Sequence, residues 1–179
     1  MERAVQPLQN FMIDKAGAHS LATTVWGEAV RLRVSRTQTN GAYTMLDYYA
    51  PAKFGPPRHV HRQDDELFLI VAGSVLIWTP DEVQAAEAGD TVFLPRGKEH
   101  TWKGYGDDPI HLQVIVSPGE FECFIPKIVQ QRLTAEDIEA LTRVADEAGM
   151  DITGPPISDA ELAEYLAAPT WNRSEGEAL

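Results

Sequence analysis

Two stretches of the chain decide the predicted fold. Residues 55–73 read GPPRHVHRQDDELFLIVAG, and residues 89–100 read GDTVFLPRGKEH. Each stretch combines an apolar, strand-like run with histidines and with glycine or proline where a chain turns. Gly73 and Gly89 stand where tight chain reversals favour a positive φ. We therefore expect both stretches to lie in one β-domain built from short strands.

The same pattern continues on both sides of these stretches. Turn signals such as Asn40-Gly41 and Pro118-Gly119 separate the runs, and no helical period occurs before residue 120. About eight to ten short strands in this arrangement predict an all-β antiparallel sandwich or barrel. The flanking strand-like runs cover residues 29–35, 42–49, 75–78, 83–86 and 110–116.

Helical signals arise only towards the C-terminus. Thr134 and Asp137 have the spacing of a capping box before an apolar stripe, which predicts a helix over 134–148, packed outside the barrel interior. Ser158 and Glu161 open a second, shorter helix. The predicted organisation is an N-terminal extension (1–24), a barrel (25–125) and a helical C-terminal extension (126–179).

Composition limits the classes of function. The chain has 179 residues, of which 44% are hydrophobic, a length and composition that suit one globular domain. The net charge of −12 disfavours binding to a phosphate backbone, so we expect no nucleic-acid partner. The single cysteine, Cys123, excludes an intrachain disulfide and an all-thiolate zinc site. No long apolar run predicts a membrane span, and we expect a cytoplasmic protein.

The histidines indicate a metal site. His59 and His61 are two residues apart, so on a strand their rings share one face. Glu66 would point to the opposite face of a straight strand, and a bend in the polar stretch 62–65 is needed to turn it inward. His100 follows the Pro95–Gly97 turn. Three imidazoles and a carboxylate suit a borderline divalent transition metal.

The two stretches resemble the two sequence motifs of the cupin superfamily. The first motif is His-x-His, three or four residues, Glu, six residues and Gly; its positions fall on His59, His61, Glu66 and Gly73. The second is Gly, five residues, Pro-x-Gly, two residues and His; its positions fall on Gly89, Pro95, Gly97 and His100. Two departures, Gly55 two residues late and Gly104 in place of Asn, touch no ligand position.

The resemblance implies a double-stranded β-helix, the jelly-roll cupin barrel, followed by two short C-terminal helices. It also implies one divalent metal per chain (Fe, Ni, Mn, Co or Zn) held by His59, His61, Glu66 and His100. Such a site leaves coordination positions open, as catalytic sites do. Phe68 and Ile70, which share the parity of Glu66, and Trp102, two residues after His100, are expected to line the pocket.

A narrower resemblance concerns the function. Together with the motifs, IHLQVIVSPGEFECFI at 110–125 is similar to small single-domain proteins related to bacterial quercetin dioxygenases. That similarity implies a dioxygenase that uses O₂ to cleave a flavonol- or enol-like small molecule. Glu66 would be the catalytic residue, because it would accept the proton of the substrate hydroxyl.

Other functions remain open at this point. One alternative is a metal-dependent isomerase or cyclase of a polyketide- or sugar-like substrate; another is a non-catalytic small-molecule-binding cupin. The resemblance also implies a homodimer. No nucleophile-elbow pattern supports a serine hydrolase.

Overall fold

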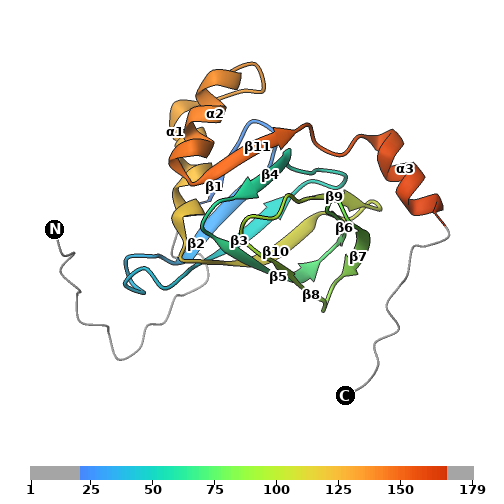
Figure 1. Ribbon diagram of the computed structural model, residues 1–179, viewed down its shortest axis with the longest axis horizontal. Helices are drawn as coiled ribbons and strands as arrows, with labels where there is room; N and C mark the ends of the chain where they lie inside the picture. Colours follow the sequence, from blue (N-terminus) through green and yellow to red (C-terminus); the bar gives the residue numbers. More distant parts are fainter. Residues whose placement is uncertain (1–20, 169–179) are drawn as a thin grey trace.

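The computed structural model describes residues 21–168; the predicted N-terminal extension lies outside this range up to residue 20 (Figure 1). Ten strands come first and helices follow, with one further strand between the last two helices. None of the helices in residues 21–168 is long and apolar enough to cross a membrane. The strands are β1 (Ala22–Thr23), β2 (Ala29–Val34), β3 (Thr44–Ala50), β4 (Arg58–His61), β5 (Asp65–Ala72), β6 (Ser74–Trp78), β7 (Val83–Glu87), β8 (Thr91–Leu94), β9 (Thr101–Tyr105), β10 (Ile110–Ser117) and β11 (Met150–Gly154). The helices are the 3₁₀ turn η1 (Glu120–Cys123), α1 (Phe124–Gln131), α2 (Ile138–Glu147) and α3 (Asp159–Ala167).

The strands form three antiparallel sheets. The largest has the order β1-β2-β3-β10-β5-β8, and the smaller ones have the orders β7-β6-β9 and β11-β4. Figure 1 shows the strands curving around a common interior, with α1 and α2 gathered at one end and α3 at the side. This arrangement confirms the predicted all-β jelly roll with helices after it.

Alternating side chains build the core of the barrel. Along β10, every second residue from Ile110 to Val116 is buried, and β5 alternates in the same way. The register places Leu112 opposite both Tyr48 on β3 and Ile70 on β5. Inward side chains from neighbouring strands therefore meet in rows, which is the period-2 pattern that the sequence predicts.

Glycine is required at the β5–β6 turn. Gly73 has φ 81°, and a Cβ there would come within 2.7 Å of the Ile110 side chain and 2.8 Å of the Pro109 carbonyl. Gly89 also has a positive φ, 102°. Both turn predictions are confirmed.

The C-terminal part differs in detail from the prediction. The helix α2 starts only after Asp137, because Thr134 and Asp137 bond to each other in the preceding turn. The Ser158–Glu161 capping box of α3 is present as expected. Two elements were not predicted from the sequence, namely α1 and the strand β11, which pairs with β4.

Candidate metal centre

Three short segments bring the predicted ligands together. His59 and His61 lie on β4, Glu66 lies near the start of β5, and His100 immediately precedes β9. The backbones of His59 and His100 form an antiparallel bridge through two N–H···O bonds of 3.0 Å. The bridge fixes the two imidazoles side by side, although 40 residues separate them in sequence.

Asp64 stabilises the bend that the parity of Glu66 requires. The chain leaves β4 at His61 and resumes as β5 at Asp65. Between them, the buried Asp64 carboxylate accepts backbone N–H bonds from Gly119, Glu120 and Phe121 at 2.8, 3.2 and 3.0 Å. Glu66 therefore points inward, as the sequence analysis expected, and 96% of its surface is buried.

The four ligand atoms converge. One side-chain atom from each of His59, His61, Glu66 and His100 lies within 4.8 Å of the others, and all four residues are buried. The Glu66 Oε2 atom is 3.1 Å from His100 Nε2 and 3.4 Å from His61 Nε2. A group with this geometry could hold one metal ion.

The outer nitrogens of two imidazoles fix their orientation. His59 Nδ1 lies 2.8 Å from the Pro57 carbonyl oxygen, and His100 Nδ1 lies 3.0 Å from the Lys98 carbonyl oxygen. Carbonyls at these distances accept from an Nδ1–H, which orients each ring so that its Nε2 faces the centre.

His61 supplies an independent test of whether a metal fits. Both of its ring nitrogens are buried and neither has a hydrogen-bond partner. Buried polar atoms of this kind are rare and costly, because they have lost water without a replacement. A cation beside His61 Nε2 would satisfy that atom, and the set of three imidazoles and a carboxylate is one that divalent transition metals accept.

Mutual electrostatics also favour a cation. Burial would raise the pKa of Glu66, but the charges of His61, His100 and His59 lower it to about 2. Burial, together with His100 and His61, lowers the pKa of His59 to about 3. The centre is thus a carboxylate beside imidazoles, at least one of which is neutral at pH 7, and these are the protonation states that ligate metals.

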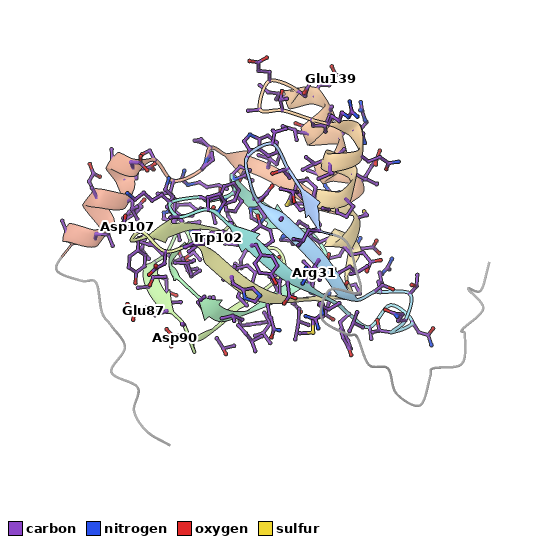
Figure 2. All side chains as sticks on the ribbon, turned by 180° about the vertical axis from the view of Figure 1, so that it is seen from behind. Arg31, Glu87, Asp90, Trp102, Asp107 and Glu139 are labelled. Carbon is purple, nitrogen blue, oxygen red and sulfur yellow. The ribbon has the colours of Figure 1, made fainter. Side chains whose placement is uncertain are left out.

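A largely apolar cavity of about 650 Å³ opens onto this group, with His59 and Glu66 in its wall. Phe68 and Trp102 line it, and Figure 2 labels Trp102 among the barrel strands. Ile70 is buried in the core but is not in the cavity wall. The apolar part of the wall comes from Trp26, Phe54, Phe68, Trp102, Leu112, Val114, Phe121, Phe124, Ile125, Ile128, Ile138, Leu141, Met150 and Ile152.

The C-terminal segment contributes to this wall, which corrects the expectation that helix 134–148 packs outside the pocket. Ile138 and Leu141 of α2 and Met150 of β11 face the cavity. Leu141 and Val144 of α2 pack in the hydrophobic core, whereas Ile138 lines the cavity but remains 70% exposed.

Several residues around the ligand group and the cavity were not predicted from the sequence. Asp64 belongs to the polar stretch 62–65, where the sequence predicted only a bend, yet it is buried. Glu28 and Tyr48, which also line the cavity, carried no motif. Arg58 and Arg62 are engaged by Glu161 and by Asp146 and Asp151, so they do not point into the cavity as free cations. The one sequence signal for Asp64 is its position directly before the strand that carries Glu66.

Comparisons with known protein families and solved structures agree with the observed fold. Residues 45–117 match the family model of the cupin domain. The fold is that of a cupin. This match and the neighbours below support the cupin superfamily, and neither points to the quercetin dioxygenases in particular. None of the curated proteins matches the chain.

Solved structures share the cupin fold at low identity. A predicted oxalate decarboxylase from Thermotoga maritima is 16% identical, with TM-score 0.52, over 59% of this chain and 98% of that one. An RmlC-like cupin from Shewanella frigidimarina is 15% identical, with TM-score 0.52, over 62% and 91%. The cupin domain of Schizosaccharomyces pombe Cnp3 is 13% identical, with TM-score 0.46, over 50% of this chain and 64% of that domain. The first two share the fold of this chain and carry different names, so the fold alone does not identify a reaction.

Proposed function

We propose that this cupin is an enzyme that binds one divalent transition metal through His59, His61, Glu66 and His100 and acts on a small organic molecule. The observation that carries the proposal is the continuity of the buried ligand group with an apolar cavity of about 650 Å³. Ligand sites have volumes of roughly 300–1,000 Å³ and combine apolar walls with a few polar groups. A purely structural metal site would not need such a cavity beside it.

The wall of the cavity narrows the class of substrate. Among residues 21–168, no lysine or arginine lines the cavity, and its acidic groups are Glu28 and Glu66. A substrate with several anionic groups, such as a dicarboxylate or a phosphate ester, would find no counter-charge there except the metal. Flat, mostly apolar molecules with an ionisable hydroxyl, such as flavonols and enols, fit the aromatic wall better.

A metal at this centre would supply Lewis acidity towards a substrate hydroxyl and, if it is redox-active, the chemistry of O₂. The protein's own groups do the remaining work. The Glu66 carboxylate lies at the boundary between ligand group and cavity, where it can accept the proton of the hydroxyl. Phe68, Trp102 and Phe121 exclude water and hold a ring in place.

The reaction that we propose is therefore a dioxygenase reaction in which O₂ cleaves a flavonol- or enol-like ring. Two observations support this reaction: the sequence similarity to proteins related to quercetin dioxygenases and the apolar wall of the cavity. A homodimer and a cytoplasmic location are further parts of the proposal that come from the sequence alone.

The decisive experiment measures O₂ consumption by the protein loaded with Fe, Ni, Co or Mn on flavonols and β-diketones. Glu66→Gln should keep substantial metal, because an amide oxygen can still coordinate, but should lose about 100-fold or more in turnover, because it cannot accept a proton. Glu87→Gln, an exposed change of the same type, is the control.

Two outcomes would contradict the proposal in different ways. Full activity in Glu66→Gln would remove the base role. Conversion of substrate without O₂ uptake would replace the oxygenase with an isomerase or cyclase, and tight binding without any conversion would indicate a non-catalytic binding protein.

A further inference from the structure

A carboxyl–phenol pair lies in the cavity wall outside the metal group. Glu28 directly precedes β2, Tyr48 lies on β3, and both side chains line the cavity. Both residues are at least 93% buried. The Tyr48 hydroxyl donates a short hydrogen bond to Glu28 Oε2.

The sheet register separates this pair from the metal group. Thr44 on β3 stands in the same row as Glu66 on β5, because both pair with Val116. Tyr48 is four residues further along β3, which is about 13 Å of strand. The two polar groups in the cavity wall therefore come from different rows of the sheet.

The surroundings of Glu28 differ from those of a buried carboxyl that serves stability alone. Asp47, the neighbour of Tyr48 on β3, is equally buried, but Arg33 forms an ion pair with it at 2.7 Å and His111 lies 3.3 Å away. Within residues 21–168, the Glu28 carboxyl forms no ion pair; it accepts a hydrogen bond from the Tyr48 hydroxyl, and the Thr24 hydroxyl, which donates to the Glu28 backbone carbonyl at 3.4 Å, lies nearby. A buried carboxyl without a cation is expensive, and such groups are typical of sites that bind a ligand.

Both groups keep spare hydrogen-bonding capacity. A carboxyl has two oxygens with about four acceptor positions, and a phenol oxygen accepts as well as donates. Burial raises the pKa of Glu28, partly offset by its hydrogen bonds to Tyr48 and Thr24. Burial and the charges of Glu28 and Glu66 raise the pKa of Tyr48 well above its usual value, so Tyr48 stays a phenol.

We propose that Glu28 and Tyr48 bind a second oxygen function of the substrate, at a place in the cavity separate from the metal group. The substrate class is then an apolar ring compound with two separated oxygen functions, one for the metal and one for this pair. The inference rests on the proposed function in one respect, namely that the cavity is the substrate site. It does not depend on the use of O₂.

The test compares binding of monohydroxy and dihydroxy aromatics to the zinc-loaded protein, so no oxygen chemistry intervenes. The probes are 2-naphthol against 2,6- and 2,7-dihydroxynaphthalene, and 4-hydroxybiphenyl against 4,4′-dihydroxybiphenyl. Binding is followed by quenching of tryptophan fluorescence, because Trp26 and Trp102 line the cavity. At least one dihydroxy compound should bind about tenfold or more tightly than its monohydroxy partner, as expected for one hydrogen bond to a charged group.

Tyr48→Phe and Glu28→Gln should each weaken that preference to about threefold or less, while zinc content stays unchanged. Tyr49→Phe is the matched control, because Tyr49 is the next residue on β3 and its ring stacks on His111, outside the cavity wall. It should keep the full preference. Indifference of the wild-type protein to the second hydroxyl across the series would overturn the inference, and so would a preference that survives in both variants.

Failure of this inference is distinguishable from failure of the proposed function. If the probes bind without a preference, the pair has no ligand role but the oxygenase reaction can still be measured. If none of the probes binds, the cavity is not a site for such compounds and both proposals fall. Loss of O₂ uptake with an intact preference contradicts only the oxygenase.

Discussion

Among the site residues, His61 most directly indicates a ligand at the centre of this barrel. Its ring lies among those of His59 and His100, at centroid distances of 5.0 and 5.7 Å, and Phe121 covers it edge-on at 5.2 Å. Within the described residues, neither of its ring nitrogens has a hydrogen-bond partner. The position is costly for an imidazole on its own and favourable for one that ligates a cation.

Replacing single histidines should separate ligands from bystanders. His59→Ala, His61→Ala or His100→Ala should each lower metal affinity by more than the roughly 10–100-fold that loss of an outer-shell partner costs. His111→Ala should retain the metal, because His111 lies on β10 beside Asp47 and outside the ligand group. Elemental analysis of the purified variants measures this. Unchanged metal content in His59→Ala or His100→Ala would refute the assigned ligand set.

Asp64 offers a second test at the scale of one residue. Asp64→Ala leaves three buried or half-buried backbone N–H groups without their acceptor, so the free energy of unfolding should fall by about 3 kcal/mol or more. Asp64→Asn keeps one acceptor oxygen and should cost less. Urea denaturation gives the values, with Asp81→Ala in an exposed turn as the control. Equal stability of Asp64→Ala and Asp81→Ala would mean that the bend does not depend on this carboxylate.

Among the elements, β11 contacts the site directly, because it pairs with the strand that carries His59 and His61. It pairs with β4 in a register that places Met150 beside His61 and Ile152 beside His59. The sheet of β4 contains no other strand in residues 21–168. The helix α2 packs against β11, so the C-terminal segment holds the strand that carries two of the ligands.

Truncation can test this dependence. A chain ending after Leu133 lacks α2, β11 and α3, and we expect its metal affinity to fall about 10–100-fold, as after loss of outer-shell support. It should also bind a hydrophobic dye, because the cavity wall of α2 and β11 is gone. A chain ending after Ile157 lacks α3 but keeps β11, and it should retain metal. Equal metal affinity of the two truncated chains would show that β11 does not support the site.

For the molecule as a whole, the proposed metal binding would be linked to folding. The ligands come from β4, from β5 and from the residue before β9, so they converge only in the folded barrel. A cation that binds only the folded state stabilises it by about 2.7 kcal/mol at a concentration 100 times Kd. At about 2–4 °C per kcal/mol for a chain of this size, Tm should rise by roughly 5–11 °C.

Thermal unfolding with and without a chelator measures the shift. The His61→Ala variant is the control, because its Tm should not respond to added zinc, nickel or iron. A chelator-insensitive Tm in the wild-type protein, combined with absence of bound metal, would contradict a metal centre.

The sequence by itself determined the features that depend on short spacings. His59 and His61 share a face because a strand has period 2, the turns at Gly73 and Gly89 need positive φ, and the Ser158–Glu161 box starts α3. His100 could be assigned to the same site only because the second motif places it at a fixed distance from Gly89, Pro95 and Gly97. These relations span few residues, so local geometry is sufficient to predict them.

The tertiary structure alone decided the long-range relations. The pairing of β11 with β4, the capping of Gly119 to Phe121 by Asp64, and the meeting of Glu28 with Tyr48 join residues that are 20 to about 90 positions apart. No local period or turn signal encodes such contacts, because they arise from how the barrel closes and which apolar surface α1 and α2 then cover. That closure places the four proposed metal ligands beside an apolar cavity whose wall also holds Glu28 and Tyr48.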